Sequence, residues 1–200
     1  MSIKIIGLTG PSGAGKSFVS AHLAKKGIPV IDADAVYHSL LTKGSDCTKA
    51  LTDEFGTEIL NENGEPDTKK LGAIVFKSEE KLKKLNSLVL GFVIDKINDM
   101  ISELEKANHT AVILDAPTLI ESGFSAECDH VISIIADKEV RINRICERDN
   151  ISIEKASMRV SAQKADDFYV NNSEYVITND SNQTELLCRV DELFGKLLND

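Results

Sequence analysis

Short apolar runs rich in β-branched residues recur along the chain, and a stretch with helical spacing follows each of them. The runs span residues 3–8, 29–31, 111–114, 130–135 and 175–178. Runs of this length predict buried strands, and their alternation with helices predicts βαβ units. The pattern therefore predicts an α/β fold with a parallel sheet and helices on both of its faces.

Two helices have clear end signals in the sequence. The first is predicted over residues 17–26, since Gly27 stands where a C′ glycine belongs and Pro29 then opens the next strand. The last begins near Asn182, with Glu185 three residues later in an arrangement typical of a capping box.

The stretch between the second and third strands is too long for one crossover. Residues 35–108 have a helical pattern, with a turn at 61–64. The longest helix is predicted to start at Ser78 and carries an apolar stripe that only Lys96 interrupts: Leu82, Leu85, Val89, Phe92, Met100 and Leu104. We expect a helical insertion over the carboxyl edge of the sheet, where an acceptor binds in open α/β folds.

The sequence GPSGAGKS, residues 10–17, follows the first strand and opens the first helix. It fits the phosphate-binding pattern G-x-x-x-x-G-K-[ST], in which small residues let backbone N–H groups turn around an anion at a helix N-terminus. The predicted nucleotide contacts are Ser12, Gly13, Ala14, Gly15, Lys16, Ser17 and Phe18. Lys16 would reach the β- and γ-phosphates and Ser17 would ligate Mg²⁺, so we expect a nucleoside triphosphate to bind here.

Two carboxylates, Asp32 and Asp34, leave the second strand at its carboxyl end. A carboxylate there can accept the proton of an attacking hydroxyl or hold Mg²⁺. An aspartate is also a favoured N-cap for the helix that follows, so spacing alone leaves both roles open.

Asp115 closes the third strand and is followed by Ala116-Pro117. An aspartate at this place in a phosphate-loop protein suits a role in positioning Mg²⁺. The alternative is ordinary turn chemistry, because Asp-x-Pro is common in loops. Together with the phosphate loop, the pattern favours the metal role.

Three arginines, Arg141, Arg144 and Arg148, follow the fourth strand at helical spacing, and Arg159 lies in a second helical stretch that starts at Ser152. Guanidinium groups on one helix face can close over phosphates and stabilise the charge that is transferred. Without the phosphate loop, the simpler interpretation is a solvated face paired with Glu139, Glu147 and Asp149.

Composition excludes several classes of protein. The chain has 200 residues and a net charge of −9, which argues against a nucleic-acid or membrane-surface binder. Its four cysteines are far apart, which suits a reducing cytoplasm better than a zinc site or a disulfide framework. The N-terminal strand carries no charged leader and apolar signal region, and no apolar run approaches about 18 residues, so we expect neither export nor a membrane span.

Taken in order, these motifs resemble the dephospho-CoA kinase family over nearly the whole chain. The resemblance rests on residues 6–17, 27–34 and 114–121, on Arg144-x-x-x-Arg148-Asp149 and Arg159-x-x-x-Gln163, and on residues 175–179. It implies a three-layer P-loop NTPase fold of the nucleoside-monophosphate-kinase group, with a five-stranded parallel sheet, a helical substrate region and a lid. Residues 1–34, 109–140 and 174–200 would form the core, residues 35–108 the substrate region and residues 141–165 the lid.

The resemblance also implies a reaction. This family transfers the γ-phosphate of ATP, with Mg²⁺, to the ribose 3′-hydroxyl of dephospho-CoA, which is the last step of coenzyme A synthesis. By position, Asp34 matches the general base, Lys16, Arg144 and Arg148 match groups at the transferring phosphate, and Asn179 lies in the segment that borders the adenine. The partner would be this small molecule, and the sequence does not decide between a monomer and a trimer.

The chain departs from the family pattern mainly in the acceptor half. Leu90-Gly91 stands where the family usually has His-Pro, and Thr68 stands where it has an arginine. Thr118 replaces a leucine, and residues 169–172 lack a basic residue. Two other interpretations therefore stay open: a kinase for another nucleoside or nucleotide-like acceptor, and a regulator that binds nucleotide without turnover.

Overall fold

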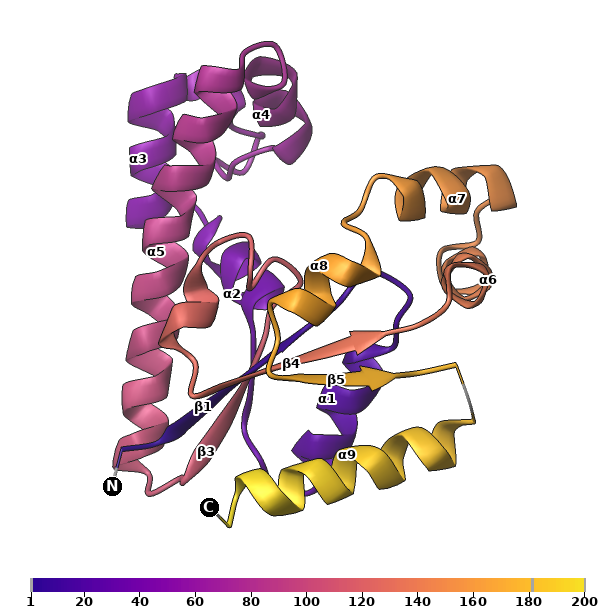
Figure 1. Ribbon diagram of the computed structural model, residues 1–200. Helices are drawn as coiled ribbons and strands as arrows, with labels where there is room; N and C mark the ends of the chain where they lie inside the picture. The colour runs from indigo at the N-terminus through magenta and orange to yellow at the C-terminus, as the bar shows by residue number, and fades with distance from the viewer. Residues whose placement is uncertain (1, 181, 200) are drawn as a thin grey trace. The chain divides into compact units, whose positions relative to one another are not determined.

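The strands form a single five-stranded sheet, as predicted (Figure 1). The structure is a computed structural model that describes residues 2–180 and 182–199, so residues 1, 181 and 200, which fall within the predicted core ranges, lie outside the described residues. The strands are β1 (Lys4–Thr9), β2 (Val30–Asp32), β3 (Ala111–Asp115), β4 (His130–Ile135) and β5 (Tyr175–Thr178). Each lies within about two residues of its predicted bounds.

The strand order is β2-β3-β1-β4-β5, and the sheet is parallel. The first strand is therefore central, with Leu8 in register with Asp115 of β3 and Thr9 in register with Ser133 of β4. Because parallel strands end at the same edge, the loop after β1 opens between the ends of β3 and β4. This topology brings the phosphate loop and Asp115 to the same edge of the sheet.

Helices from both halves of unit 1 lie against this sheet. The helices α1 (Lys16–Lys25) and α9 (Gln183–Leu197) lie against one face, and the short α8 (Asp166–Asn171) lies against the other (Figure 1). The main core lies between the sheet and the helices α1 and α9, and its fully buried members include Ile6, Leu23 and Val190. Because both faces of the sheet bury apolar side chains, the strands are continuous apolar runs in the sequence.

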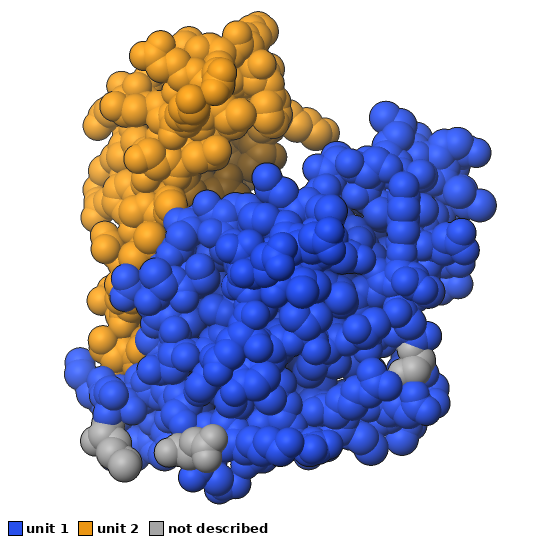
Figure 2. Space-filling view, in the orientation of Figure 1, with its two compact units in different colours: residues 1–31, 103–200 blue, residues 32–102 orange. Residues whose placement is uncertain are grey.

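The chain divides into two compact units, which Figure 2 shows in different colours. Unit 1 comprises residues 1–31 and 103–200, and unit 2 comprises residues 32–102. Unit 2 is helical: it holds α2 (Ala33–Leu40), α3 (Asp46–Phe55), the 3₁₀ turn η1 (Thr57–Ile59), α4 (Thr68–Val75) and most of α5 (Glu79–Lys106). Its own core includes Leu51, Ile59 and Leu71.

The long helix α5 begins one residue after the predicted start at Ser78. Four residues of the predicted stripe pack on the core of unit 2: Leu82, Leu85, Val89 and Phe92. In the second half, the buried residues are Ile97 and Ile101, which the prediction left out. Each lies one position after a predicted residue, which is a rotation of about 100° around the helix, so the second half of α5 buries a different face from the first half.

The local end signals are confirmed. Gly27 follows α1 with a φ of 86°, the left-handed conformation expected of a C′ glycine. The Asn182 side chain accepts a hydrogen bond from the Glu185 N–H at 3.0 Å, which is one half of the predicted capping box. In the predicted turn, Gly64 has a φ of 79°. Among the described residues, no helix is long and apolar enough to cross a membrane.

The remaining elements lie in unit 1 after β3. They are the 3₁₀ turn η2 (Phe124–Glu127) and the helices α6 (Lys138–Asp149) and α7 (Ile153–Ser161). Helices α6 and α7 pack together around Ile145, Ala156 and Val160, and Asn150 turns the chain between them in a left-handed conformation. The segment predicted as a lid is thus a helical hairpin with its own small core.

Candidate active site

The loop between β1 and α1 presents unpaired backbone donors at the carboxyl edge of the sheet. Within residues 2–180 and 182–199, the N–H groups of Gly13, Gly15, Lys16 and Ser17 have no protein acceptor. The Ala14 N–H instead closes a turn onto the Pro11 carbonyl at 3.2 Å. Free N–H groups at a helix N-terminus form an anion-binding site, which is what the sequence pattern predicts here.

Gly15 is required at the start of α1 for two reasons. It is the N-cap residue, and its φ of 101° is a backbone conformation that residues with a side chain rarely adopt. A Cβ atom at Gly15 would also lie 2.2 Å from Nδ2 of Asn179. A side chain at this position would therefore both strain the backbone and displace the buried amide behind the loop.

Two side chains hold the outer side of the loop by its carbonyl groups. Asn179, which is 5% exposed, donates from Nδ2 to the Ala14 carbonyl at 2.7 Å. Arg144 donates from Nη1 to the Gly13 carbonyl at 3.3 Å and from Nη2 to the Asn179 carbonyl at 3.0 Å. Because C=O and N–H point in opposite directions across a trans peptide, holding the Ala14 carbonyl turns the Gly15 N–H toward the phosphate side.

This arrangement predicts the effect of an Asn179→Ala variant. The Ala14 carbonyl would lose a buried donor, and the Gly15 N–H would lose its fixed direction. We expect the KM for ATP to rise on the order of tenfold and the melting temperature to fall by several degrees, the usual scale for a buried unsatisfied group. Steady-state kinetics with varied ATP and thermal unfolding check this, and an unchanged KM would contradict it.

Lys16 forms an ion pair with Asp115. Its Nζ contacts Oδ1 of the aspartate, and the side chains are only 13% and 6% exposed. The predicted phosphate-binding cation therefore lies directly beside the carboxylate that closes β3. Since both charges are largely shielded from water, each depends on the other for compensation.

The residues predicted to hold Mg²⁺ have the right chemistry for it. Asp115 offers a carboxylate at the strand end, and Ser17 is exposed in the first turn of α1 beside free N–H groups. Mg²⁺ prefers oxygen ligands and is bound through one or two protein groups together with substrate phosphates. Phe18, the last predicted loop contact, is 38% exposed in the same turn.

The two predicted lid arginines, Arg144 and Arg148, have different contacts. Arg144 contacts the phosphate loop, whereas Arg148 donates to both carboxylate oxygens of Asp149, at 2.7 and 3.0 Å, and Arg159 donates to the same carboxylate. These contacts lower the pKa of Asp149 and raise the pKa of Arg148. Asp149 therefore bridges Arg148 and Arg159 on the α6–α7 hairpin through two ion pairs.

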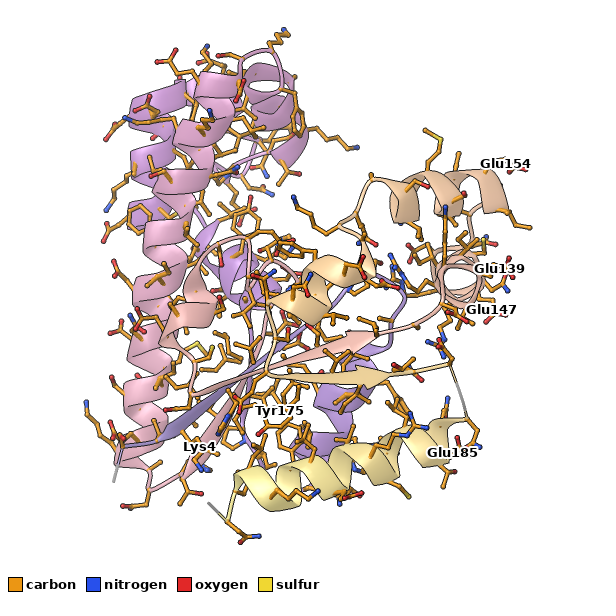
Figure 3. The ribbon with its side chains drawn as sticks, in the orientation of Figure 1. Lys4, Glu139, Glu147, Glu154, Tyr175 and Glu185 are labelled. Atoms are coloured by element: carbon orange, nitrogen blue, oxygen red, sulfur yellow. The ribbon has the colours of Figure 1, made fainter. Side chains whose placement is uncertain are left out.

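The simpler interpretation of these arginines, a face paired with neighbouring acidic residues, holds only in part. Glu139 and Glu147 point outward from α6, away from the sheet (Figure 3). In the described part of the chain, neither glutamate forms an ion pair with the arginines of α6 or α7. The partner of Arg148 and Arg159 is Asp149 alone among the acidic residues that the sequence suggested.

The two aspartates after β2 have different local roles. Asp32 is the N-cap of α2, and its Oδ1 accepts a hydrogen bond from the Ala35 N–H at 3.0 Å. Asp34 is exposed in the first helical turn and is not the capping residue. The N-cap role that the sequence left open therefore belongs to Asp32, and the Asp34 carboxylate is available for chemistry.

The sequence places Arg141 with Arg144 and Arg148 on one helix face, but it does not predict the buried position that Arg141 takes. Arg141 is 4% exposed, and its guanidinium contacts the Ser12 carbonyl. Its spacing from Arg144 made it look like another surface arginine. The signal that separates the two is that Arg141 lies one turn before the buried Ile145 and so shares its face of α6.

The chain is similar to known proteins over most of its length. The family described as dephospho-CoA kinase matches residues 4–185. A curated relative of that name from Fusobacterium nucleatum is 41% identical over 192 residues, covering 96% of this chain and 97% of the relative.

Two solved structures have the same fold. A crystal structure of a Thermus thermophilus protein matches with a TM-score of 0.84 and 27% identity, covering 98% of this chain and 99% of that one. Dephospho-CoA kinase from Campylobacter jejuni matches with a TM-score of 0.72 and 24% identity, covering 98% and 97%. The family match over residues 4–185 and the relative at 41% identity show that the chain belongs to the dephospho-CoA kinase family.

Proposed function

We propose that this protein transfers the γ-phosphate of ATP to the ribose 3′-hydroxyl of dephospho-CoA and so makes coenzyme A. The observation that carries the proposal is the set of free N–H groups at Gly13, Gly15, Lys16 and Ser17, in a chain whose family is one of kinases. These donors suit a phosphate chain.

The donor half of the reaction is supported by unit 1. The loop N–H groups and Lys16 would neutralise the β- and γ-phosphates, while Arg144 and Asn179 keep the loop in shape. Phosphoryl transfer depends mainly on positioning and charge stabilisation, with little covalent chemistry left to the protein. Ser17 and Asp115 would hold Mg²⁺, which when bound neutralises charge on the phosphate oxygens.

The acceptor half is proposed for residues 35–108, with Asp34 as the general base. Asp34 suits that role because its carboxylate is exposed and does not cap a helix. The α6–α7 hairpin, within residues 141–165, would close over the phosphates as a lid and bring Arg148 to the transferring group. Closure of this kind keeps water from becoming the acceptor.

We further propose a cytoplasmic location. All four cysteines, Cys47, Cys128, Cys146 and Cys188, are free thiols. Free thiols persist in a reducing compartment.

A coupled ADP-release assay with Mg²⁺ and ATP tests the function. It compares dephospho-CoA with a panel of nucleosides and nucleoside monophosphates at matched concentrations. We expect saturable turnover with dephospho-CoA and at most background rates with the panel. Turnover restricted to another acceptor would overturn the proposed substrate and would implicate Thr68 and Leu90-Gly91, where the chain departs from its family's pattern.

A further inference from the structure

Arg141 joins three segments of unit 1 that lie far apart in the sequence. Its Nε donates to the Ser12 carbonyl at 3.2 Å, its Nη2 to Oε1 of Gln163 at 2.8 Å and its Nη1 to Oδ1 of Asp166 at 3.2 Å. The side chain is 4% exposed, so water does not replace these partners. Each of its three nitrogens therefore has a protein acceptor.

The contact with Ser12 acts on the phosphate loop. The Ser12 carbonyl and the Gly13 N–H belong to one peptide plane and point in opposite directions. Since Arg141 holds the carbonyl, it also sets the direction of the Gly13 N–H, which has no protein acceptor among the described residues. A Cβ on Gly13 would lie 2.8 Å from the Arg141 carbonyl oxygen, so the loop and α6 are in close contact here.

The other two contacts hold the arginine from the connection between α7 and α8. Gln163 follows α7, and Asp166 is the first residue of α8. Burial lowers the pKa of Arg141, and the Asp166 carboxylate opposes that change. The buried cation therefore relies on two acceptors that follow α7 in the chain. These are the amide oxygen of Gln163 and the carboxylate of Asp166, whose side chain is 43% exposed.

We propose that Arg141 is a positioning residue that couples the connection after α7 to the phosphate loop. In this arrangement the peptide at residues 12–13 is set for phosphate binding while Gln163 and Asp166 hold the guanidinium. A change in the position of the α6–α7 hairpin would then alter the affinity for ATP through this one side chain. The inference rests on the proposed function, because it concerns the same ATP site.

The test measures ATP affinity by isothermal titration calorimetry in the absence of any acceptor. The variants are Gln163→Ala, which removes one acceptor from the guanidinium, and Arg141→Lys, which keeps the charge but loses the planar fork. The matched controls are Gln183→Ala, an exposed glutamine on α9, and Arg189→Lys, an exposed arginine that donates to the Thr178 carbonyl.

We expect the Kd for ATP to rise on the order of tenfold in both variants, the scale of one hydrogen bond to a charged group, and to stay unchanged in the controls. The KM for the acceptor should change by less than about twofold, because no acceptor contact is touched. The double variant should bind ATP no more weakly than Arg141→Lys, since the glutamine acts through the arginine.

A purely structural role gives a different result. It would lower the melting temperature of Gln163→Ala and leave its ATP affinity at the wild-type value, which would overturn the inference. If Arg141→Lys does not fold, Gln163→Ala decides the matter. Wild-type protein that binds no ATP would instead overturn the proposed function, so the two failures are distinct.

Discussion

The Lys16→Ala variant is expected to lower kcat/KM for ATP by roughly 10²- to 10³-fold, the scale for losing one preorganised charge-stabilising donor. Lys16 is the charged group at the N-terminus of α1, beside the four free N–H donors of the loop. Without it, the β- and γ-phosphates would lose their nearest compensating charge from the loop. Steady-state ADP release with varied ATP measures this change.

The ion pair of Lys16 with Asp115 means that the same variant also affects stability. It leaves a carboxylate that is only 6% exposed without its partner, which costs about 3–5 kcal/mol for a buried pair. The double variant Lys16→Ala with Asp115→Asn isolates the effect on stability, because an amide has no charge to compensate. It should regain most of the lost unfolding free energy in urea denaturation and remain inactive. Recovery of activity with stability would contradict the role of Lys16 at the phosphates.

The Asp34→Asn variant is expected to lower kcat by on the order of 10² to 10⁴ while ATP binding is preserved. The amide keeps the size of the side chain but cannot accept the proton of the attacking hydroxyl. Asp34 is exposed and caps no helix, so the substitution should leave the melting temperature unchanged. The measurements are kcat at saturating substrates and the Kd for ATP by calorimetry.

Asp32→Asn is the matched control for this prediction. Asp32 is two residues away and caps α2 through its side chain, and asparagine caps a helix as well as aspartate does. We expect its kcat to stay close to that of the wild type. Equal losses in the two variants would show that the proton acceptor is not Asp34 specifically.

Much of this arrangement is predictable from local sequence. The strands are confirmed to within about two residues because each is a short apolar run bounded by clear breakers such as Gly27 and Pro29. Parallel pairing predicts that Asp115 and the loop after β1 lie at the same edge of the sheet, whereas the strand order that makes β3 the neighbour of β1 is known only from the structure. The free N–H groups of the loop follow from the glycine-rich motif and the helix start after it.

What could not be predicted depends on contacts between distant segments. Arg141 and Arg144 lie three residues apart and cannot be told apart in the sequence. In the structure Arg141 is buried, whereas Arg144 contacts the loop from outside. The difference depends on their partners in other segments: Arg141 donates to Gln163 and Asp166, and Arg144 donates to Asn179. Likewise the sequence could not assign the cap after β2, since Asp32 and Asp34 are equally good cap residues.

The role of Asn179 shows the same limit. Resemblance to the family predicts only that it lies in the segment bordering the adenine, and that assignment stays a prediction. Its side chain donates to the Ala14 carbonyl and its backbone carbonyl accepts from Arg144. These contacts give Asn179 a second role, in holding the phosphate loop, which no local pattern in residues 175–179 indicates.

The central claim is that the new phosphate is placed on the ribose of dephospho-CoA, and identification of the product tests it most directly. The wild-type protein is incubated with Mg²⁺, ATP and dephospho-CoA, and the product is analysed by mass spectrometry and ³¹P NMR. The account predicts a product one phosphoryl group heavier than dephospho-CoA, with the new phosphorus signal coupled to the ribose 3′ proton. A product phosphorylated elsewhere, or unchanged dephospho-CoA with active ATP-binding protein, would contradict it.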